Sequence, residues 1–340
     1  MIEILNTIDS VVWGPAMIAL LLGTHIFLTV RTGFIQRKLP QALRMSWGGG
    51  TSKGEGDISN FGALATALAA TIGTGSIVGV ATAIIAGGPG AVFWMWITGV
   101  FGMATKYVEV YASVRYRVRD HAGNMLGGAM YVWERAFMRK DGTRPWWAKL
   151  GGIAFAAFAV VATIGTGSAV QSAAITGIIE SSFPGVPDWA IALVIAIAVA
   201  LVIFGGVKSI SSVAEKLVPF MAVAYVGGCM VILAINWQYV GPALAMIFEC
   251  AFTSKAAFGG AVGSGIMVAL QFGCARGLFS NESGLGSYRC GCCCNEEPRT
   301  PGACRHDGHV LVDRRDLRRY GHRARCRWHC QSRPHRKWRH

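Results

Sequence analysis

Clusters of glycine and hydroxyl residues interrupt the apolar sequence of this chain, and their chemistry suits ligand binding rather than catalysis. The first is Thr71-Ile72-Gly73-Thr74-Gly75-Ser76, in the middle of a long apolar run. Glycine and hydroxyl side chains weaken a helix inside a membrane, where no water replaces lost backbone hydrogen bonds. A helix that breaks there frees amides and carbonyls that can line a site. Close helix packing through small residues is the competing interpretation.

Two further polar interruptions favour the binding interpretation. Phe279-Ser280-Asn281-Glu282-Ser283-Gly284-Leu285-Gly286 follows the last apolar run, and Thr163-Ile164-Gly165-Thr166-Gly167-Ser168 repeats the first hexapeptide, with Gln171 close behind. A glutamine within a membrane helix bonds to another helix or contacts a ligand. A phosphate-binding loop at the first cluster is a poor alternative, because no strand precedes it. Lys106 and Glu109, three residues apart on one helix face, are expected to pair as structural residues.

Helices that cross a bilayer must position these residues. The chain is 53% hydrophobic and only 15% charged, which argues against a soluble protein. About 20 apolar residues in a helix cross the hydrocarbon layer. We expect an all-α integral membrane fold, in which Val240–Phe252 is too short to span and is re-entrant or interfacial. The seven runs of sufficient length are Val11–Val30, Phe61–Ile85, Ala91–Ala112, Gly151–Ile178, Trp189–Gly205, Val213–Ile235 and Phe258–Gly277.

The charges of the connecting loops predict an orientation. Basic residues gather in the loops 31–60 and 113–149, whereas the loops 86–90 and 180–188 contain none. Because loops rich in Lys and Arg remain in the cytoplasm, the N-terminus is expected outside. The segment His121–Lys149 mixes apolar and charged residues, which predicts a helix lying on the cytoplasmic face of the membrane.

Three motifs together resemble the sodium:alanine symporters. They are Gly87-Gly88-Pro89-Gly90-Ala91-Val92-Phe93-Trp94-Met95-Trp96, the segment Gly73–Gly79, and Ala275-Arg276-Gly277-Leu278 with the polar octapeptide that follows it. The resemblance covers residues 10 to 287. It implies a transporter rather than an enzyme, with a bundle of inverted five-helix repeats and two broken helices in the second and seventh apolar runs. It also implies sodium-driven uptake of alanine or glycine.

The resemblance assigns roles to residues of the clusters. Backbone amides near the first break would hold the substrate carboxylate, polar side chains would bond the ammonium group, and an aromatic wall would limit the substrate side chain. The expected substrate residues are Gly73, Thr74, Gly75, Gln171, Phe279, Ser280 and Asn281. The expected cation residues, for the co-transported Na⁺, are Thr71, Thr74 and Ser76. The resemblance further implies a monomer in a bacterial-type inner membrane, with the lipid bilayer as partner and no nucleic acid.

The chain changes character after Ser287. The segment from Tyr288 to His340 holds fourteen of the 32 Lys and Arg, seven of the ten Cys and six of the eight His. Its cysteines and histidines, among them Cys290, Cys292, Cys293, Cys294, Cys304, His306 and His309, lack the paired spacing of a zinc site and are interpreted as incidental. Its arginines lack a recognisable nucleic-acid-binding module.

A shift of reading frame explains this segment better. Codons for the run Cys290 to Pro298, read one nucleotide later, permit a run of alanines. We therefore expect two parts: residues 1–287 are the first part of a symporter, and residues 288–340 are an aberrant, disordered tail. On this interpretation the chain is truncated and does not transport. The alternative is a membrane-anchored regulator whose basic tail binds a metal or a nucleic acid.

Overall fold

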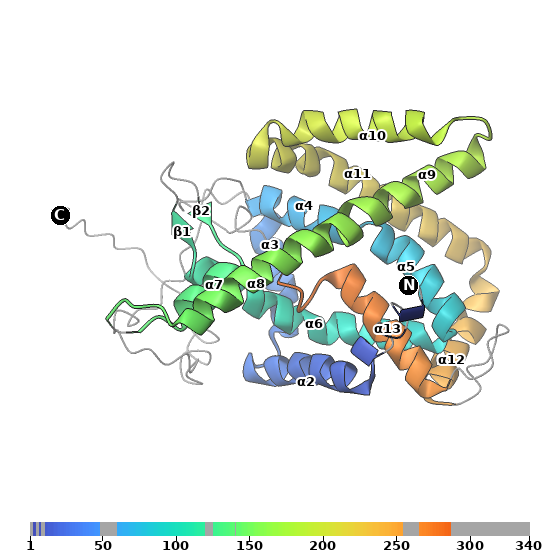
Figure 1. Ribbon diagram of the computed structural model, residues 1–340. Coiled ribbons are helices and arrows are strands. Elements are labelled where there is room, and N and C mark those ends of the chain that lie inside the picture. The colour runs from blue at the N-terminus through green and yellow to red at the C-terminus, as the bar shows by residue number, and fades with distance from the viewer. Residues whose placement is uncertain are drawn as a thin grey trace.

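The fold is an assembly of helices (Figure 1). The computed structural model describes residues 3, 4, 7, 11–47, 60–119, 125–139, 141–253 and 265–286. Its helices are α2 (Pro15–Arg31), the 3₁₀ turn η1 (Ile35–Lys38), α3 (Leu39–Trp47), α4 (Asn60–Thr71), α5 (Thr74–Gly87), α6 (Gly90–Arg115), α7 (Ala129–Ala136), α8 (Trp146–Ala162), the π-helical η2 (Thr163–Ala169), α9 (Val170–Ser182), α10 (Asp188–Ile203), α11 (Gly206–Ile235), α12 (Trp237–Phe252) and α13 (Ile266–Asn281).

Where they are described, the seven expected apolar runs are largely helical, but fewer helices are long and apolar enough to cross a bilayer. Residues 258–264 of the last run lie outside the described residues. Within the described ranges three qualify: Phe61–Gly87, Trp146–Ser182 and Lys208–Ile235. The pair Pro15–Arg31 and Ile35–Leu43, bent by 59°, makes a fourth if it counts as one span. The helix α10 has only 16 residues, about 24 Å at 1.5 Å per residue. The number of seven membrane segments therefore stays a prediction.

Residues with special backbone conformations mark several of the boundaries between helices. Gly33 and Phe34, with φ of 69° and 59°, turn the chain between α2 and η1. Gly88, with φ of 74°, ends α5, and Pro89 immediately precedes α6. Glycine adopts positive φ without steric cost, and proline has the φ of a first helical turn.

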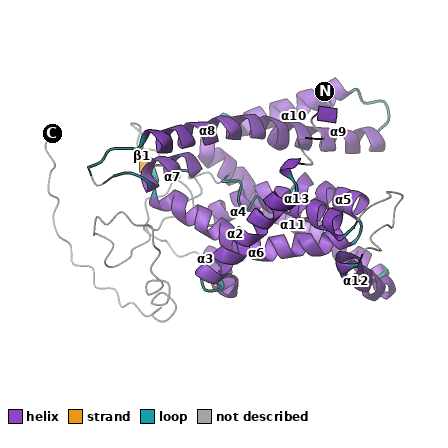
Figure 2. Ribbon diagram, turned by 60° about the horizontal axis from the view of Figure 1, so that its bottom comes forward, coloured by secondary structure: helices purple, strands orange, loops and turns teal. Residues whose placement is uncertain are grey.

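The helices α8, η2 and α9 follow one another along a single path that crosses the molecule diagonally in Figure 1. Figure 2 shows α8, α9 and α10 along one edge of the body, with α12 at the far end. Large apolar side chains are exposed on these outer helices, such as Phe158 of α8 at 76% and Leu201 of α10 at 72%. Apolar surface of this extent marks contact with a membrane or with another protein.

The prediction of one interfacial helix over His121–Lys149 was wrong. In the described part, β1 (Val118–Arg119) and β2 (Met125–Leu126) pair as a short antiparallel ladder, and the eight-residue helix α7 follows. Gly128, with φ of 124°, separates β2 from α7. A turn at Asp141-Gly142 then leads to α8, whose N-cap is Pro145. The two strands are the exception to the expected all-α fold, and the tail from residue 288 lies outside the described residues.

Among the described residues, α6 and α13 make the most extensive contact between two helices. Glycines of α13 face α6 so closely that a Cβ on Gly273 would lie 2.6 Å from Trp94 Cβ, and one on Gly277 would overlap Thr98. Small residues let membrane helices approach with their backbones nearly in contact. The end of α13 is therefore positioned by α6.

Candidate functional site

The apolar stretch formed by α4 and α5 is interrupted at Ile72 and Gly73. Gly73 is extended, with φ of −147° and ψ of −160°, and it is the N-cap of α5. The amides of Ser76 and Ile77 donate to the carbonyl of Gly73 at 3.1 and 3.3 Å. The N-terminus of α5 thus begins inside the apolar stretch, and its partial positive charge faces the break. Such an end favours an anion, as in many phosphate and carboxylate sites.

Gln171 on α9 reaches the break from a helix that is distant in sequence. The amide N–H of Thr74 donates a long hydrogen bond of 3.5 Å to Gln171 Oε1. A Cβ on Gly73 would lie 3.4 Å from Gln171 Nε2, so the amide group lies directly against the glycine backbone. Gln171 lies two residues after the π-helical segment η2. π-Helical turns within α-helices are frequent at functional sites. The structure therefore brings Gly73, Thr74 and Gln171 together.

The end of α13 forms the other side of the break. Ser280 Oγ lies 2.8 Å from Ser76 Oγ, and Ser76 Oγ also donates to the carbonyl of Thr71 at 2.7 Å. A Cβ on Gly75 would lie 3.1 Å from Phe279 Cδ1 and 3.3 Å from Ser280 Cα. These contacts place the ring of Phe279 against the first turn of α5, so a side chain larger than hydrogen at residue 75 would displace it.

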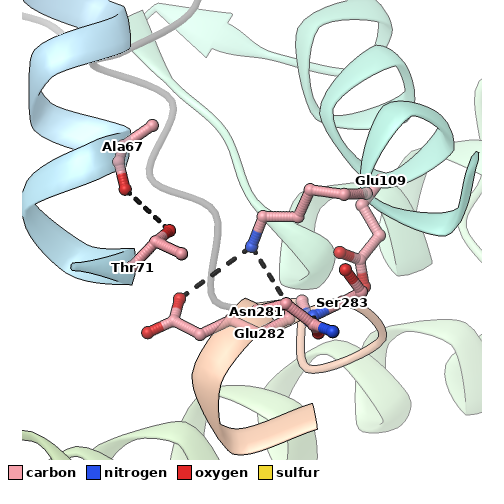
Figure 3. Close-up of polar contacts among 8 residues, drawn as sticks. Ala67, Thr71, Glu109, Asn281, Glu282 and Ser283 are labelled. Carbon is pink, nitrogen blue, oxygen red and sulfur yellow. Dashed lines mark hydrogen bonds and ion pairs between the residues drawn. The ribbon is translucent and has the colours of Figure 1, made fainter. Parts of the chain in front are cut away.

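Two expected site residues have other partners. Thr71 Oγ1 donates to the carbonyl of Ala67 at 3.0 Å, inside its own helix. Asn281 Oδ1 accepts from the amide of Ser283 at 2.9 Å and caps the turn after α13. Both bonds hold the local backbone. Figure 3 shows Thr71 bonded back to Ala67 and Asn281 within the turn.

Thr74 differs from the other hydroxyl residues near the break. Its Oγ1 is buried and has no hydrogen-bond partner among the described residues. A buried hydroxyl without a partner loses free energy, about 1 to 3 kcal/mol. Coordination of a hard cation by this hydroxyl oxygen would compensate for the missing hydrogen bond, because hard cations prefer oxygen ligands.

A cavity of about 210 Å³ lies beside the site, between α5, α6 and α13. Apolar side chains form most of its wall, and Ser280 and Asn281 supply its polar end. Its lining residues are Val80, Val92, Met95, Trp96, Gly99, Gly277, Ser280 and Asn281. The cavity is smaller than the 300 to 1,000 Å³ typical of drug-sized ligands. Ser280 and Asn281 at its polar end were expected site residues, whereas its apolar walls were not predicted from the sequence.

Lys106 and Glu109 of α6 both reach the turn that follows α13. Lys106 Nζ donates to the carbonyl of Glu282 at 3.2 Å and lies 3.9 Å from Glu282 Oε2. Glu109 Oε1 accepts from the amide of Gly286 at 3.1 Å. The sequence suggested that Lys106 and Glu109 pair structurally; it did not suggest that they hold the end of α13. The spacing of Gly102, Lys106 and Glu109 places all three on one face of the helix, which indicates that this face packs against another element.

Comparison with known proteins decides the family. The profile of the sodium:alanine symporter family matches residues 1–297. The chain belongs to this family. The family membership confirms the resemblance seen in the motifs and, with the candidate membrane helices, makes the chain a multi-pass membrane protein.

Several relatives are themselves described as transporters. The sodium/alanine symporter AgcS of Methanococcus maripaludis is 49% identical over 288 residues, which is 84% of this chain and 61% of that protein. An uncharacterized transporter of Haemophilus influenzae is 51% identical over 287 residues, 84% of this chain and 60% of its own. A probable sodium/glutamine symporter, GlnT of Bacillus subtilis, is 36% identical, with 84% and 57% covered. The chain thus spans about 60% of the length of these relatives.

Proposed function

We propose that this symporter-family chain binds alanine or glycine together with Na⁺ and takes part in their coupled uptake across the membrane. The observation that carries the proposal is the break at Ile72 and Gly73, which meets Gln171 from α9 and Phe279 and Ser280 from α13. A discontinuous helix inside the bilayer is the usual place of a transporter's site. The names of the relatives, with sodium/alanine and sodium/glutamine symport among them, support an amino acid substrate.

The substrate carboxylate binds at the N-terminus of α5 in this proposal. The amides of Gly73, Thr74 and Gly75 lie at the start of that helix, where the macrodipole favours negative charge. Gln171 Oε1 and the hydroxyl of Ser280 are acceptors for the ammonium group, and Asn281 contributes from the adjacent cavity. The ring of Phe279, which lies against Gly75, would limit the size of the substrate side chain.

The Na⁺ ion uses the oxygens at the break. Thr74 Oγ1 is the best supported ligand, because it is buried without a hydrogen-bond partner within the described part of the chain. Ser76 and Thr71 are the other proposed ligands, because their hydroxyls donate to the carbonyls of Thr71 and Ala67 and keep oxygen lone pairs for a cation. One Na⁺ that moves down 100 mV supplies about 2.3 kcal/mol, which is enough to concentrate a neutral amino acid about fiftyfold.

The orientation and the compartment are part of the same proposal. The chain lies in the inner membrane with its N-terminus outside, because its basic loops then face the cytoplasm. It acts as a monomer, without a nucleic-acid partner. The comparisons give no support to the expectation that the chain as written does not transport.

The test is alanine binding to the purified chain, in NaCl and in choline chloride, with Gly75→Leu as the diagnostic variant. A leucine side chain at residue 75 collides with Phe279 and Ser280, so Na⁺-dependent binding should fall at least about a hundredfold. Gly177→Leu on α9 is the matched control, because a Cβ there meets nothing within 4 Å. Normal binding by Gly75→Leu would show that the substrate lies elsewhere.

A further inference from the structure

One face of α6 follows α13 to its end and beyond. Thr98, Gly102, Lys106 and Glu109 share this face, at spacings of four, four and three residues. Thr98 meets Gly277 so closely that a Cβ on Gly277 would overlap its hydroxyl oxygen. The backbones of α6 and α13 are therefore in contact just before Phe279.

The turn after α13 is held by the next part of the same face. Lys106 Nζ donates to the carbonyl of Glu282 at 3.2 Å and lies 3.9 Å from its carboxylate. Glu109 Oε1 accepts from the amide of Gly286 at 3.1 Å. Ser283, only 3% exposed, lies over Gly102, where an added Cβ would be 3.1 Å from Ser283 Cβ. Figure 3 shows the Glu109 side chain beside the turn that carries Asn281, Glu282 and Ser283.

The backbone of this turn does not adopt its conformation by local preference. Glu282 has a positive φ of 52°, which is uncommon for a residue with a side chain, and Gly284 and Gly286 have φ of 104° and 63°. Such a conformation persists where surrounding contacts determine it. Gly286 is also wedged between helices, since a Cβ there would lie 2.9 Å from Phe155 of α8 and 3.1 Å from Ala129 of α7.

The three site residues Phe279, Ser280 and Asn281 lie between these two attachments. On one side Gly277 is packed on Thr98, and on the other Glu282 is bonded to Lys106. Because α13 ends at Asn281, the direction of Phe279 toward Gly75 and of Ser280 toward Ser76 depends on where the turn is fixed.

We propose that Lys106 and Glu109 are positioning residues of the substrate site, which act through the turn 282–286 on Phe279 and Ser280. The proposal rests on the proposed function, because it concerns the same site. The side chains of Lys106 and Glu282 are 26% and 31% exposed, so their interaction is only partly screened by solvent. Lys106 and Glu109 bond to the turn 282–286, and through this turn they set the geometry of the break.

The first experiment measures the position of Ser280 without any substrate. In the full chain carrying Ser76→Cys and Ser280→Cys, the two sulfur atoms replace hydroxyl oxygens 2.8 Å apart. The rate of disulfide formation under a mild oxidant is followed by mass spectrometry of the peptides that contain residues 76 and 280. Lys106→Met should lower this rate about tenfold, the effect of one lost charged hydrogen bond. Lys106→Arg, which keeps the charge and the donors, should restore most of it.

Glu109 gives a second, independent pair of variants. Glu109→Gln keeps an oxygen that accepts from Gly286 and should link at nearly the rate of the parent, whereas Glu109→Met removes the acceptor and should slow linking. Lys149→Met is the matched control for Lys106→Met, because Lys149 is exposed on α8. Only the monodisperse fraction after size-exclusion chromatography is compared. If a variant at one of the two residues misfolds, the pair of variants at the other residue provides the test.

The second experiment measures the dissociation constant of alanine in NaCl, in chains with both serines present. Lys106→Met and Glu109→Met should raise it about tenfold, while Lys106→Arg and Glu109→Gln stay near the parent value. Unchanged linking rates in both methionine variants would overturn the positioning role. Failure of the parent chain to bind alanine would instead refute the proposed function, and the linking rates would still decide the role of Lys106 and Glu109.

Discussion

A single hydroxyl closes much of the break in the second apolar run. Ser76 Oγ donates to the carbonyl of Thr71 at 2.7 Å and lies 2.8 Å from Ser280 Oγ. In hydrocarbon an unsatisfied carbonyl costs several kcal/mol, so a helix can be interrupted only where other groups replace its bonds. Ser76 satisfies the carbonyl of Thr71 at the end of α4 and also contacts Ser280 of α13. The interruption of the helix is therefore stabilised by specific hydrogen bonds.

Gln171 should contribute to alanine binding through its polar amide group. Replacement by leucine keeps the size of the side chain but removes Oε1 and Nε2, which lie against Thr74 and Gly73. The loss of about one neutral hydrogen bond should raise the dissociation constant of alanine about fivefold in an equilibrium binding assay. Gln238→Leu on α12, an exposed position, serves as control, and equal affinities of the two variants would exclude Gln171 from the site.

The candidate residues could be found from the sequence, but their neighbours could not. Glycine and hydroxyl residues in an apolar run show where a helix is weak, and the structure has its break at Gly73 as expected. That Gln171 faces this break, whereas Asn281 caps a turn, depends on how α9 and α13 approach α5. No spacing along the chain contains that information.

At the scale of elements, one hexapeptide adopts two structures. Thr71–Ser76 breaks its helix, whereas the identical Thr163–Ser168 stays helical as the wide π-helical segment η2. In the second copy Thr163 Oγ1 and Ser168 Oγ donate to carbonyls four residues earlier in the same helix. In the first copy Ser76 bonds across the break and to α13. The partner helix thus decides the outcome, which is why local sequence could locate these segments but not distinguish them.

The close approach of α6 and α13 should make α13 intolerant of larger residues. Gly273→Val adds a side chain where even a Cβ would lie 2.6 Å from Trp94 Cβ. Such overpacking costs about 1 to 3 kcal/mol and should lower the melting temperature in detergent by roughly 5 °C. Gly228→Val on α11, where a Cβ meets nothing within 4 Å, should leave the melting temperature unchanged. A similar fall in melting temperature in both variants would show that valine within a helix causes the loss of stability, rather than overpacking between α6 and α13.

For the molecule as a whole, the described binding groups lie in the region that the family profile matches. The profile covers residues 1–297, and the groups at the break all precede residue 282. The region 298–340, with most of the strongly basic segment, lies beyond the match. Composition predicts a boundary earlier, after Ser287, because long apolar runs and an arginine-rich segment have opposite preferences for a membrane. That boundary stays a prediction.

Removal of residues 288–340 should therefore leave alanine binding intact. The shortened chain keeps the break, Gln171, Ser280 and the turn bonded by Lys106 and Glu109, so its dissociation constant for alanine in NaCl should agree with that of the full chain within about twofold. A chain that ends at Leu278 is the contrasting control, because it lacks Phe279 and Ser280 and should lose binding. A large loss of affinity in the first variant would give the basic segment a direct part in binding, as a regulator with a functional tail would require.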